Sequence, residues 1–168
     1  KFDIWCVYKS KEHRPKYLST MNRYLGFFDT SIHAHFVAML IALYPLFETR
    51  RDTFNVPRVL KILEKEGRLA GQRKAKVEMY YAEATPIWRK VNVLRNEAFA
   101  HRSESLTIAQ IFEKANIKPD ELKHLIDLTK KLINSISLAV DRSSHAFNLE
   151  GASATIRVLK DLKAFREG

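Results

Sequence analysis

Hydrophobic residues return at helical spacing through most of the chain. From Lys16 to about Glu48 they recur every three or four positions, which predicts one long or gently broken helix with bends at Gly26 and Pro45. The apolar positions of this stretch are Leu18, Met21, Tyr24, Leu25, Phe28, Ile32, Phe36, Met39, Leu40, Leu43 and Leu46. Residues Phe2–His13 suit a short helix packed on the bundle, which Pro15 either ends or restarts.

Polar residues and prolines divide the middle of the chain into further helices. Asn55, just before Val56-Pro57, predicts an N-cap with proline in the first turn, and Gly67 should stop that helix after Glu66. The next helix should begin around Leu69 to Gln72. Thr85-Pro86 then either kinks it or caps a fresh helix.

The last third of the pattern predicts three more helices. Thr107 can cap a short helix through Lys114, and Pro119 can open a long one. Its expected buried stripe is Leu122, Leu125, Ile126, Thr129, Leu132, Ile133, Ile136 and Val140. Gly151-Ala152-Ser153 should break the chain before an amphipathic C-terminal helix that carries Ile156, Leu159, Leu162, Lys163 and Phe165.

Composition turns this pattern into a fold class. The 168 residues include only five Gly and five Pro, which favours helices over strands and turns, so we predict an all-α bundle of about five to seven helices in a single domain over residues 1–168. Cys6 is the sole cysteine, so neither an internal disulfide nor a cysteine-based zinc site can form. We expect a reducing, cytoplasmic location. The most apolar run, Phe36–Phe47, is too short for a bilayer, which needs about 20 residues, so we expect no membrane partner.

Charge indicates the class of partner. Lys and Arg number 29 against 19 acidic residues, for a net charge of +10. Between Val56 and Lys118 there are 13 basic and 7 acidic residues. A polyanion such as RNA is therefore the expected partner.

One stretch within this basic region combines residue types that suit chemistry. Ile87, Val91, Leu94 and Ala98 form a buried helical face, from which Arg95 and Asn96 depart. His101 follows where polar residues end the apolar pattern, near the expected end of the helix. A guanidinium, an amide and an imidazole can together bind a phosphate and move a proton near neutral pH.

An Arg followed by Asn and then by a His at a helix end resembles the signature of the HEPN superfamily. The sequence motif LRNEAFAHR is preceded by an aromatic-rich long helix and the segment TRRDTFNVPRVLKIL. This arrangement is most similar to the AbiU2 branch of abortive-infection HEPN domains. The resemblance covers roughly Tyr17 to Val140. It implies a HEPN-like helical bundle, metal-independent ribonuclease activity in phage defence, and sites paired in a dimer.

The candidate site residues follow from this stretch and from the charge. With no metal site, no cofactor and no phosphate-binding glycine loop in the sequence, RNA cleavage would use the 2′-hydroxyl of the substrate as nucleophile. His101 would move the proton and Arg95 would clamp the nonbridging oxygens. Asn96 would orient His101 or the phosphate. Arg102, Arg50 and Arg51 are the expected RNA contacts.

Helical geometry leaves several alternatives open. Arg95 and His101 diverge by about 120° on an ideal helix, so either the helix ends or distorts before His101, or a second subunit of a two-fold homodimer completes the site. Glu97 can hold the His101 ring, although an ordinary surface pair is the favoured interpretation. In the purely structural alternative, Arg95 makes surface ion pairs and His101 interacts with the helix dipole.

Two other functions compete with the toxin or defence ribonuclease. One is a noncatalytic HEPN-like domain that dimerises or binds RNA as the partner of a nucleotidyltransferase or an antitoxin. The other is a plain basic helical RNA-binding domain. Fold alone cannot separate the first of these from the enzyme, because both have the same architecture.

Overall fold

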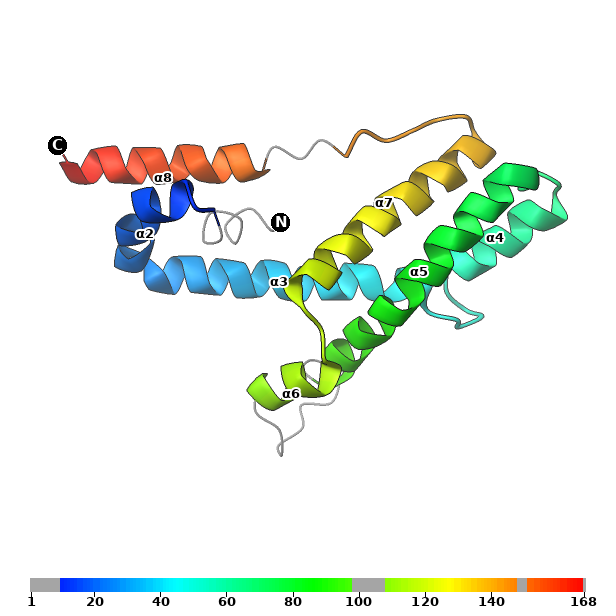
Figure 1. The fold of residues 1–168 in the computed structure, drawn as a ribbon, viewed down its shortest axis with the longest axis horizontal. Coiled ribbons are helices and arrows are strands. Elements are labelled where there is room, and N and C mark those ends of the chain that lie inside the picture. Colours follow the sequence, from blue (N-terminus) through cyan, green and yellow to red (C-terminus); the bar gives the residue numbers. More distant parts are fainter. Residues whose placement is uncertain (1–9, 98–107, 148–150, 168) are drawn as a thin grey trace. The chain divides into compact units, whose positions relative to one another are not determined.

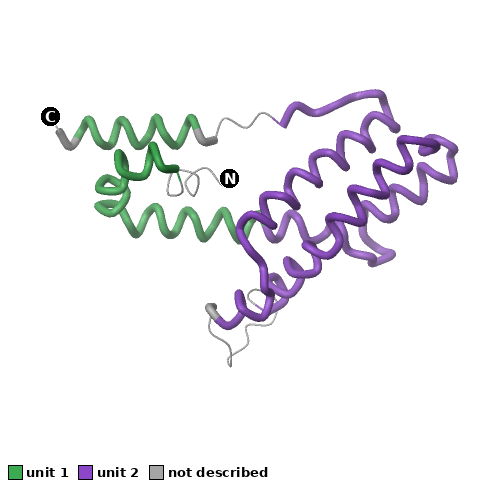
Figure 2. Tube along the Cα trace, in the orientation of Figure 1, with its two compact units in different colours: residues 1–39, 148–168 green, residues 40–147 purple. Residues whose placement is uncertain are grey.

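The computed structural model describes residues 10–97, 108–147 and 151–167. These residues form seven helices and no strand, which confirms the all-α prediction (Figure 1). Their contacts divide the chain into two compact units: unit 1 holds residues 1–39 and 148–168, and unit 2 holds residues 40–147 (Figure 2). The expectation of a single domain over residues 1–168 stays a prediction.

Unit 1 is built from helix α2 (His13–Arg23), the first part of α3 (Leu25–Phe47) and α8 (Gly151–Glu167). Its core is a small cluster of Tyr17, Met21, Phe28 and Leu159, with Tyr24, Ile156 and Leu162 packed against it. Helix α2 carries Pro15 near its start, so the proline opens a helix here. Residues 2–9 of the helix predicted over Phe2–His13 lie outside the described residues, and residues 11 and 12 form a turn before α2.

The long N-terminal helix is interrupted at Tyr24. The backbone of Tyr24 leaves the helical region, with φ −110° and ψ 35°, and the Tyr24 N–H donates to the carbonyl of Met21 at 3.1 Å. The break falls two residues before Gly26, where we expected a bend. Pro45, the other predicted bend, lies within the last turn and a half of α3.

Helix α3 is longer than the apolar run that we considered for membrane insertion. It begins at Leu25, so the argument from the short Phe36–Phe47 run does not apply to the whole helix. By length and composition alone, α3 is the one helix in the described part of the chain that could cross a membrane, a test that core helices of soluble proteins also pass. Leu40, Leu43 and Phe47 at its end are buried in the core.

Unit 2 contains the end of α3 and the helices α4 (Val56–Lys65), α5 (Gly71–Arg95), α6 (Ile108–Ala115) and α7 (Pro119–Val140). Helix α5 packs along α7 and also contacts α6, while α4 contacts α7. Arg68, just beyond α4, donates to the carbonyl of Val140, one of the last α7 carbonyls that have no partner within their own helix. The start and end of α4 agree with the prediction, since Asn55 caps it and Gly67 follows with φ +69°.

Helix α5 runs unbroken through Pro86, so the alternative of a fresh helix at Thr85 is wrong. Its buried face is Val77, Ala84, Ile87, Val91 and Leu94. Pro86 lies on the exposed side of the helix. Because proline has no N–H, the carbonyl of Ala82 has no helical hydrogen-bond partner. Ala82 is exposed as well, so water can solvate that carbonyl. The Thr85 hydroxyl donates to the carbonyl of Tyr81 at 2.7 Å.

The predicted buried stripe of α7 is confirmed in its centre and wrong at its end. Leu122, Leu125, Thr129 and Leu132 are buried, as are Leu128 and Ala139, which we did not include. Val140 is exposed because it is the last residue of the helix. Phe165 on α8, expected on the apolar face, is 84% exposed because the unit 1 core ends before it. The predicted cap Thr107 lies outside the described residues.

Candidate active site

The C-terminal end of α5 presents Arg95 at the edge of the unit 2 core. Val91 and Leu94 are fully buried, and each residue turns the helix by about 100°. Arg95 and Asn96 therefore leave the buried face and lie half-buried beside it. The structure thus places Arg95 and Asn96 beside the buried face, as predicted, and ends α5 at Arg95, whereas we expected the end of the helix near His101.

Two asparagines fix the direction of the Arg95 guanidinium. Arg95 Nη1 donates to Asn96 Oδ1 at 3.0 Å, and Asn96 Nδ2 donates to Asn92 Oδ1 at 3.0 Å. Arginine has donors only, so Asn96 must turn its oxygen toward Arg95 and its amide nitrogen toward Asn92. The Arg95 donor on one side and the Asn92 acceptor on the other together set how the Asn96 amide is turned.

An aromatic ring from α3 supports the same guanidinium. Arg95 Cζ lies 4.5 Å from the centroid of the Tyr44 ring, which is cation–π distance. Trp88 holds Tyr44 in place, because its indole N–H donates to the Tyr44 carbonyl at 3.1 Å and the two rings lie 6.1 Å apart. That carbonyl is among the last four of α3, which have no partner within their own helix.

One edge of the Arg95 guanidinium is left available by these contacts. Among the described residues, neither Nε nor Nη2 of Arg95 has a hydrogen bond or an ion pair, and no carboxylate pairs with the charge. The neighbouring carboxylate, Glu97, is instead paired with Lys114 of α6 through a 2.6 Å contact. An ordinary surface pair was the favoured interpretation of Glu97, with His101 as its partner. The structure shows such a pair, but with Lys114.

The helix changes pitch just before the predicted histidine. Asn96 and Glu97 continue α5 as a wider π-type turn. Such turns occur often at functional sites, and this one supplies a distortion before His101, one of the two alternatives that the 120° divergence left open. His101 and Arg102 themselves lie outside the described residues.

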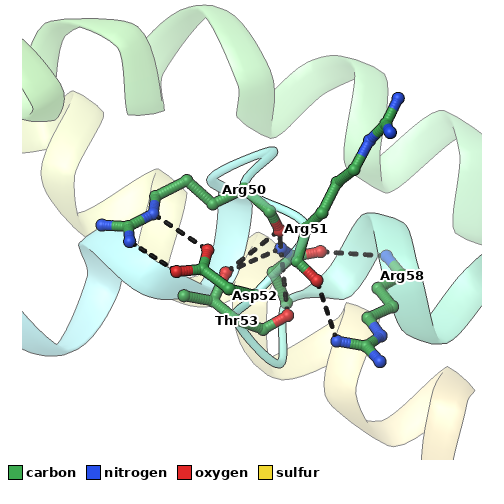
Figure 3. A network of polar contacts seen from close by, with 6 residues as sticks. Arg50, Arg51, Asp52, Thr53 and Arg58 are labelled. Atoms are coloured by element: carbon green, nitrogen blue, oxygen red, sulfur yellow. Dashed lines mark hydrogen bonds and ion pairs between the residues drawn. The ribbon is translucent and has the colours of Figure 1, made fainter.

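The other predicted RNA contacts lie in the loop between α3 and α4 (Figure 3). Asn55 is buried and organises this loop. Its Oδ1 accepts from the backbone N–H of Arg58 at 3.0 Å, and its Nδ2 donates to the Arg50 carbonyl at 2.8 Å. Arg58 Nη1 donates to the Arg51 carbonyl at 3.1 Å.

Arg50 and Arg51 differ in the state of their charges. Arg50 binds Asp52 through Nε at 3.1 Å and Nη2 at 2.6 Å. The hydrogen bond to Asp52 raises the pKa of Arg50, and in return the pKa of Asp52 falls below its ordinary value. The Arg51 side chain extends away from this network and is exposed (Figure 3).

The sequence as a whole carries a family signal. The sequence model of the AbiU2 family of HEPN domains matches residues 2–155. The chain belongs to this family. No curated protein and no solved structure matches it. This AbiU2-family match confirms the resemblance drawn from LRNEAFAHR and TRRDTFNVPRVLKIL, runs through both units, and connects the protein with abortive infection.

Three residues that support Arg95 in the candidate site were not assigned to it from the sequence. Asn92 could have been found, because it lies four residues before Asn96 and such pairs meet on a helix surface. Tyr44 and Trp88 gave no signal linking them to Arg95, since the contact depends on how α3 meets α5. Within the described ranges, no three His, Cys, Asp or Glu side chains lie close enough to hold a metal ion.

Proposed function

We propose that this HEPN protein is a metal-independent endoribonuclease that acts as a toxin or phage-defence effector. The observation that carries the proposal is the Nε–Nη2 edge of Arg95, which is held in a defined direction and has no partner among the described residues. A planar pair of N–H donors matches two oxygens of a phosphate. An RNA phosphodiester is the anion that the basic chain and the family connection both favour.

The reaction would use the ribose of the substrate. The 2′-oxygen attacks phosphorus, the bond to the 5′-oxygen breaks, and the products are a 2′,3′-cyclic phosphate and a 5′-hydroxyl. One proton leaves the 2′-hydroxyl and one reaches the 5′-oxygen. Arg95 would stabilise the charge that grows on the nonbridging oxygens, and His101 would transfer a proton, as imidazoles do near neutral pH.

A single imidazole does not easily serve as base and acid in one step. A symmetric homodimer that brings two motifs together would supply both groups, and this is the assembly that we propose. Arg51 and Arg102 would add contacts to the RNA backbone, as would Arg50 if it leaves Asp52. Light scattering that gives a monomer at tens of micromolar would contradict the paired site.

The test is cleavage of single-stranded and structured RNA in EDTA, with His101→Ala beside the wild type. We expect cleavage to survive EDTA, to end in 2′,3′-cyclic phosphate, and to fall by about 10²–10⁴-fold in His101→Ala while RNA affinity stays nearly constant. Circular dichroism melting checks that the variant is folded. Activity that returns only on addition of a divalent ion would overturn the mechanism.

A noncatalytic role is the second candidate, and it is favoured by the same observation. An available guanidinium edge binds a phosphate whether or not a proton is transferred. The protein would then bind RNA, or serve as the partner of an antitoxin or a nucleotidyltransferase. Intact RNA in every lane, with tight binding that Arg95→Lys weakens, would support this role over cleavage.

A further inference from the structure

We infer that Tyr44 and Asn92 are positioning residues for Arg95, an inference that rests on the proposed ribonuclease function. Tyr44 limits where the guanidinium can lie, and Asn92 limits how it is turned. Neither residue belongs to the Arg95–His101 stretch. Together they hold a cation in one orientation without placing a carboxylate on it, and none of the described carboxylates pairs with it.

Tyr44 acts through the face of its ring. The guanidinium carbon of Arg95 lies 4.5 Å from the ring centroid, and both side chains are half-buried, so the contact is partly shielded from water. Trp88 fixes the backbone of Tyr44 through the 3.1 Å hydrogen bond to its carbonyl. The Tyr44 ring is therefore held in place as a packing surface for the Arg95 guanidinium.

Asn92 acts through Asn96. If Asn92 did not accept from Asn96 Nδ2, the Asn96 amide could rotate and turn its nitrogen toward Arg95, where two donors would oppose each other. With Asn92 in place, Asn96 Oδ1 stays directed at Arg95 Nη1. Among the described residues, this leaves the Nε–Nη2 edge without a partner, so that edge is the one available to a phosphate.

The chemical value of this support is that it carries no negative charge. A carboxylate would hold Arg95 more tightly, but it would occupy the donors that the phosphate needs. A neutral ring and two neutral amides orient the donors before the reaction begins. Donors oriented in advance stabilise charge in the transition state without having to reorganise.

The experiment compares single-turnover cleavage at saturating RNA, where differences in affinity drop out. Tyr44→Leu removes the ring face and should lower the rate by roughly 3- to 30-fold. Tyr44→Phe keeps the face and should stay within about twofold of the wild type. Asn92→Leu removes the acceptor and should lower the rate by roughly 2- to 10-fold.

Tyr80→Leu is the matched control. Tyr80 is also half-buried in unit 2 and also lies beneath a cation, with Lys131 Nζ 5.8 Å from its ring centroid, but it has no contact with Arg95. Its cleavage rate should equal that of the wild type. Equal losses in Tyr80→Leu and Tyr44→Leu would mean that packing explains both, and would overturn the inference.

A second measurement separates failure of the inference from failure of the proposed function. The Nε–Hε signal of Arg95, assigned by its loss in Arg95→Lys, should shift in Tyr44→Leu and Asn92→Leu and stay near the wild-type position in Tyr44→Phe. An unmoved signal in both Leu variants would overturn the inference even if the wild type cleaves RNA. A shifted signal in a protein that cuts no RNA would keep the positioning role and remove the ribonuclease.

Discussion

Arg50 and Arg95 show two ways of holding an arginine in one molecule. Arg50 is fixed by a carboxylate that takes both Nε and Nη2, whereas Arg95 is fixed by a tyrosine ring and an asparagine that leave this same edge without a partner among the described residues. The first arrangement neutralises the charge. The second orients it and keeps it available.

This difference bears on how basic surfaces are read from a sequence. Arg50 and Arg51 are adjacent and look equivalent in the segment TRRD, yet one is paired and the other extends away (Figure 3). Binding a phosphate through Arg50 would first require its bidentate pair to break. The nearby carboxylate, more than the number of arginines, decides which of them can contact an anion.

The largest effect is expected from Arg95→Lys. Lysine keeps the charge but lacks the planar fork of donors, so cleavage should fall by about 10²- to 10³-fold, a larger loss than the loss of RNA affinity. Rates and gel-shift affinities on one RNA measure the two quantities.

Arg50→Lys is the counterpart of that change in the paired arginine. Its cleavage rate should stay near the wild type, because Arg50 is already bound to Asp52. If both lysine variants lose cleavage equally, the distinction between the two arginines fails.

A smaller effect is expected from Arg51→Gln, which should act on affinity alone. Loss of one phosphate contact on a single strand should lower affinity by about fivefold at 0.1 M salt and reduce the salt slope by about 0.7. Arg50→Gln should change either quantity much less. The measurement is a salt titration of RNA binding. If the affinities of Arg51→Gln and Arg50→Gln depend equally on salt concentration, Arg51 is not the preferred contact.

Asp52→Asn should make Arg50 resemble an unpaired arginine. It removes a negative charge and releases the Nε–Nη2 edge, so RNA affinity should rise by roughly two- to threefold, less than a full contact because the freed side chain must be ordered on binding. A double-mutant cycle with Arg50→Gln measures the coupling. A fall in affinity would instead mean that the paired form of Arg50 binds RNA.

The smallest effect is the pH dependence of the Arg50–Asp52 pair. Arg50 holds the pKa of Asp52 below its ordinary 3.8, so the pair stabilises the fold above the unfolded pKa and is lost as pH falls through the lower folded value. Both groups are on the surface, where such pairs contribute little. The melting temperatures of wild type and Asp52→Asn should differ slightly and constantly between about pH 5 and 8, and the difference should shrink as the pH falls below the unfolded pKa and vanish below the folded pKa of Asp52.

Local rules predicted much of the fold. The Asn55 cap, the end of α4 before Gly67 and the start of α7 at Pro119 depend on a few adjacent residues, so the sequence contains the necessary information. The position of Arg95 at a helix end follows from the apolar spacing before it. The same spacing could not predict where a helix face loses its packing partner, which is why Val140 was expected to be buried and Phe165 was expected on a packed apolar face, whereas both are exposed.

The candidate site was predicted only in its local part. Arg95 and Asn96 were found from their neighbours, whereas Tyr44 reaches Arg95 through the packing of two helices far apart in sequence. The Arg50–Asp52 pair forms in one of several conformations open to an exposed loop. The sequence does not determine whether an exposed arginine there binds a carboxylate of the same chain or a ligand. Such choices depend on tertiary contacts.

The Asn55 amide has a consequence for how this surface can evolve. It joins the Arg50 carbonyl to the first turn of α4 at Arg58, which fixes the length of the chain between them. Side chains that point outward from the loop, such as Arg51 and Phe54, can be exchanged without disturbing that amide. Adding or deleting one residue would pull the carbonyl away from it. Diversification of this surface is therefore expected to proceed by replacing residues at constant loop length.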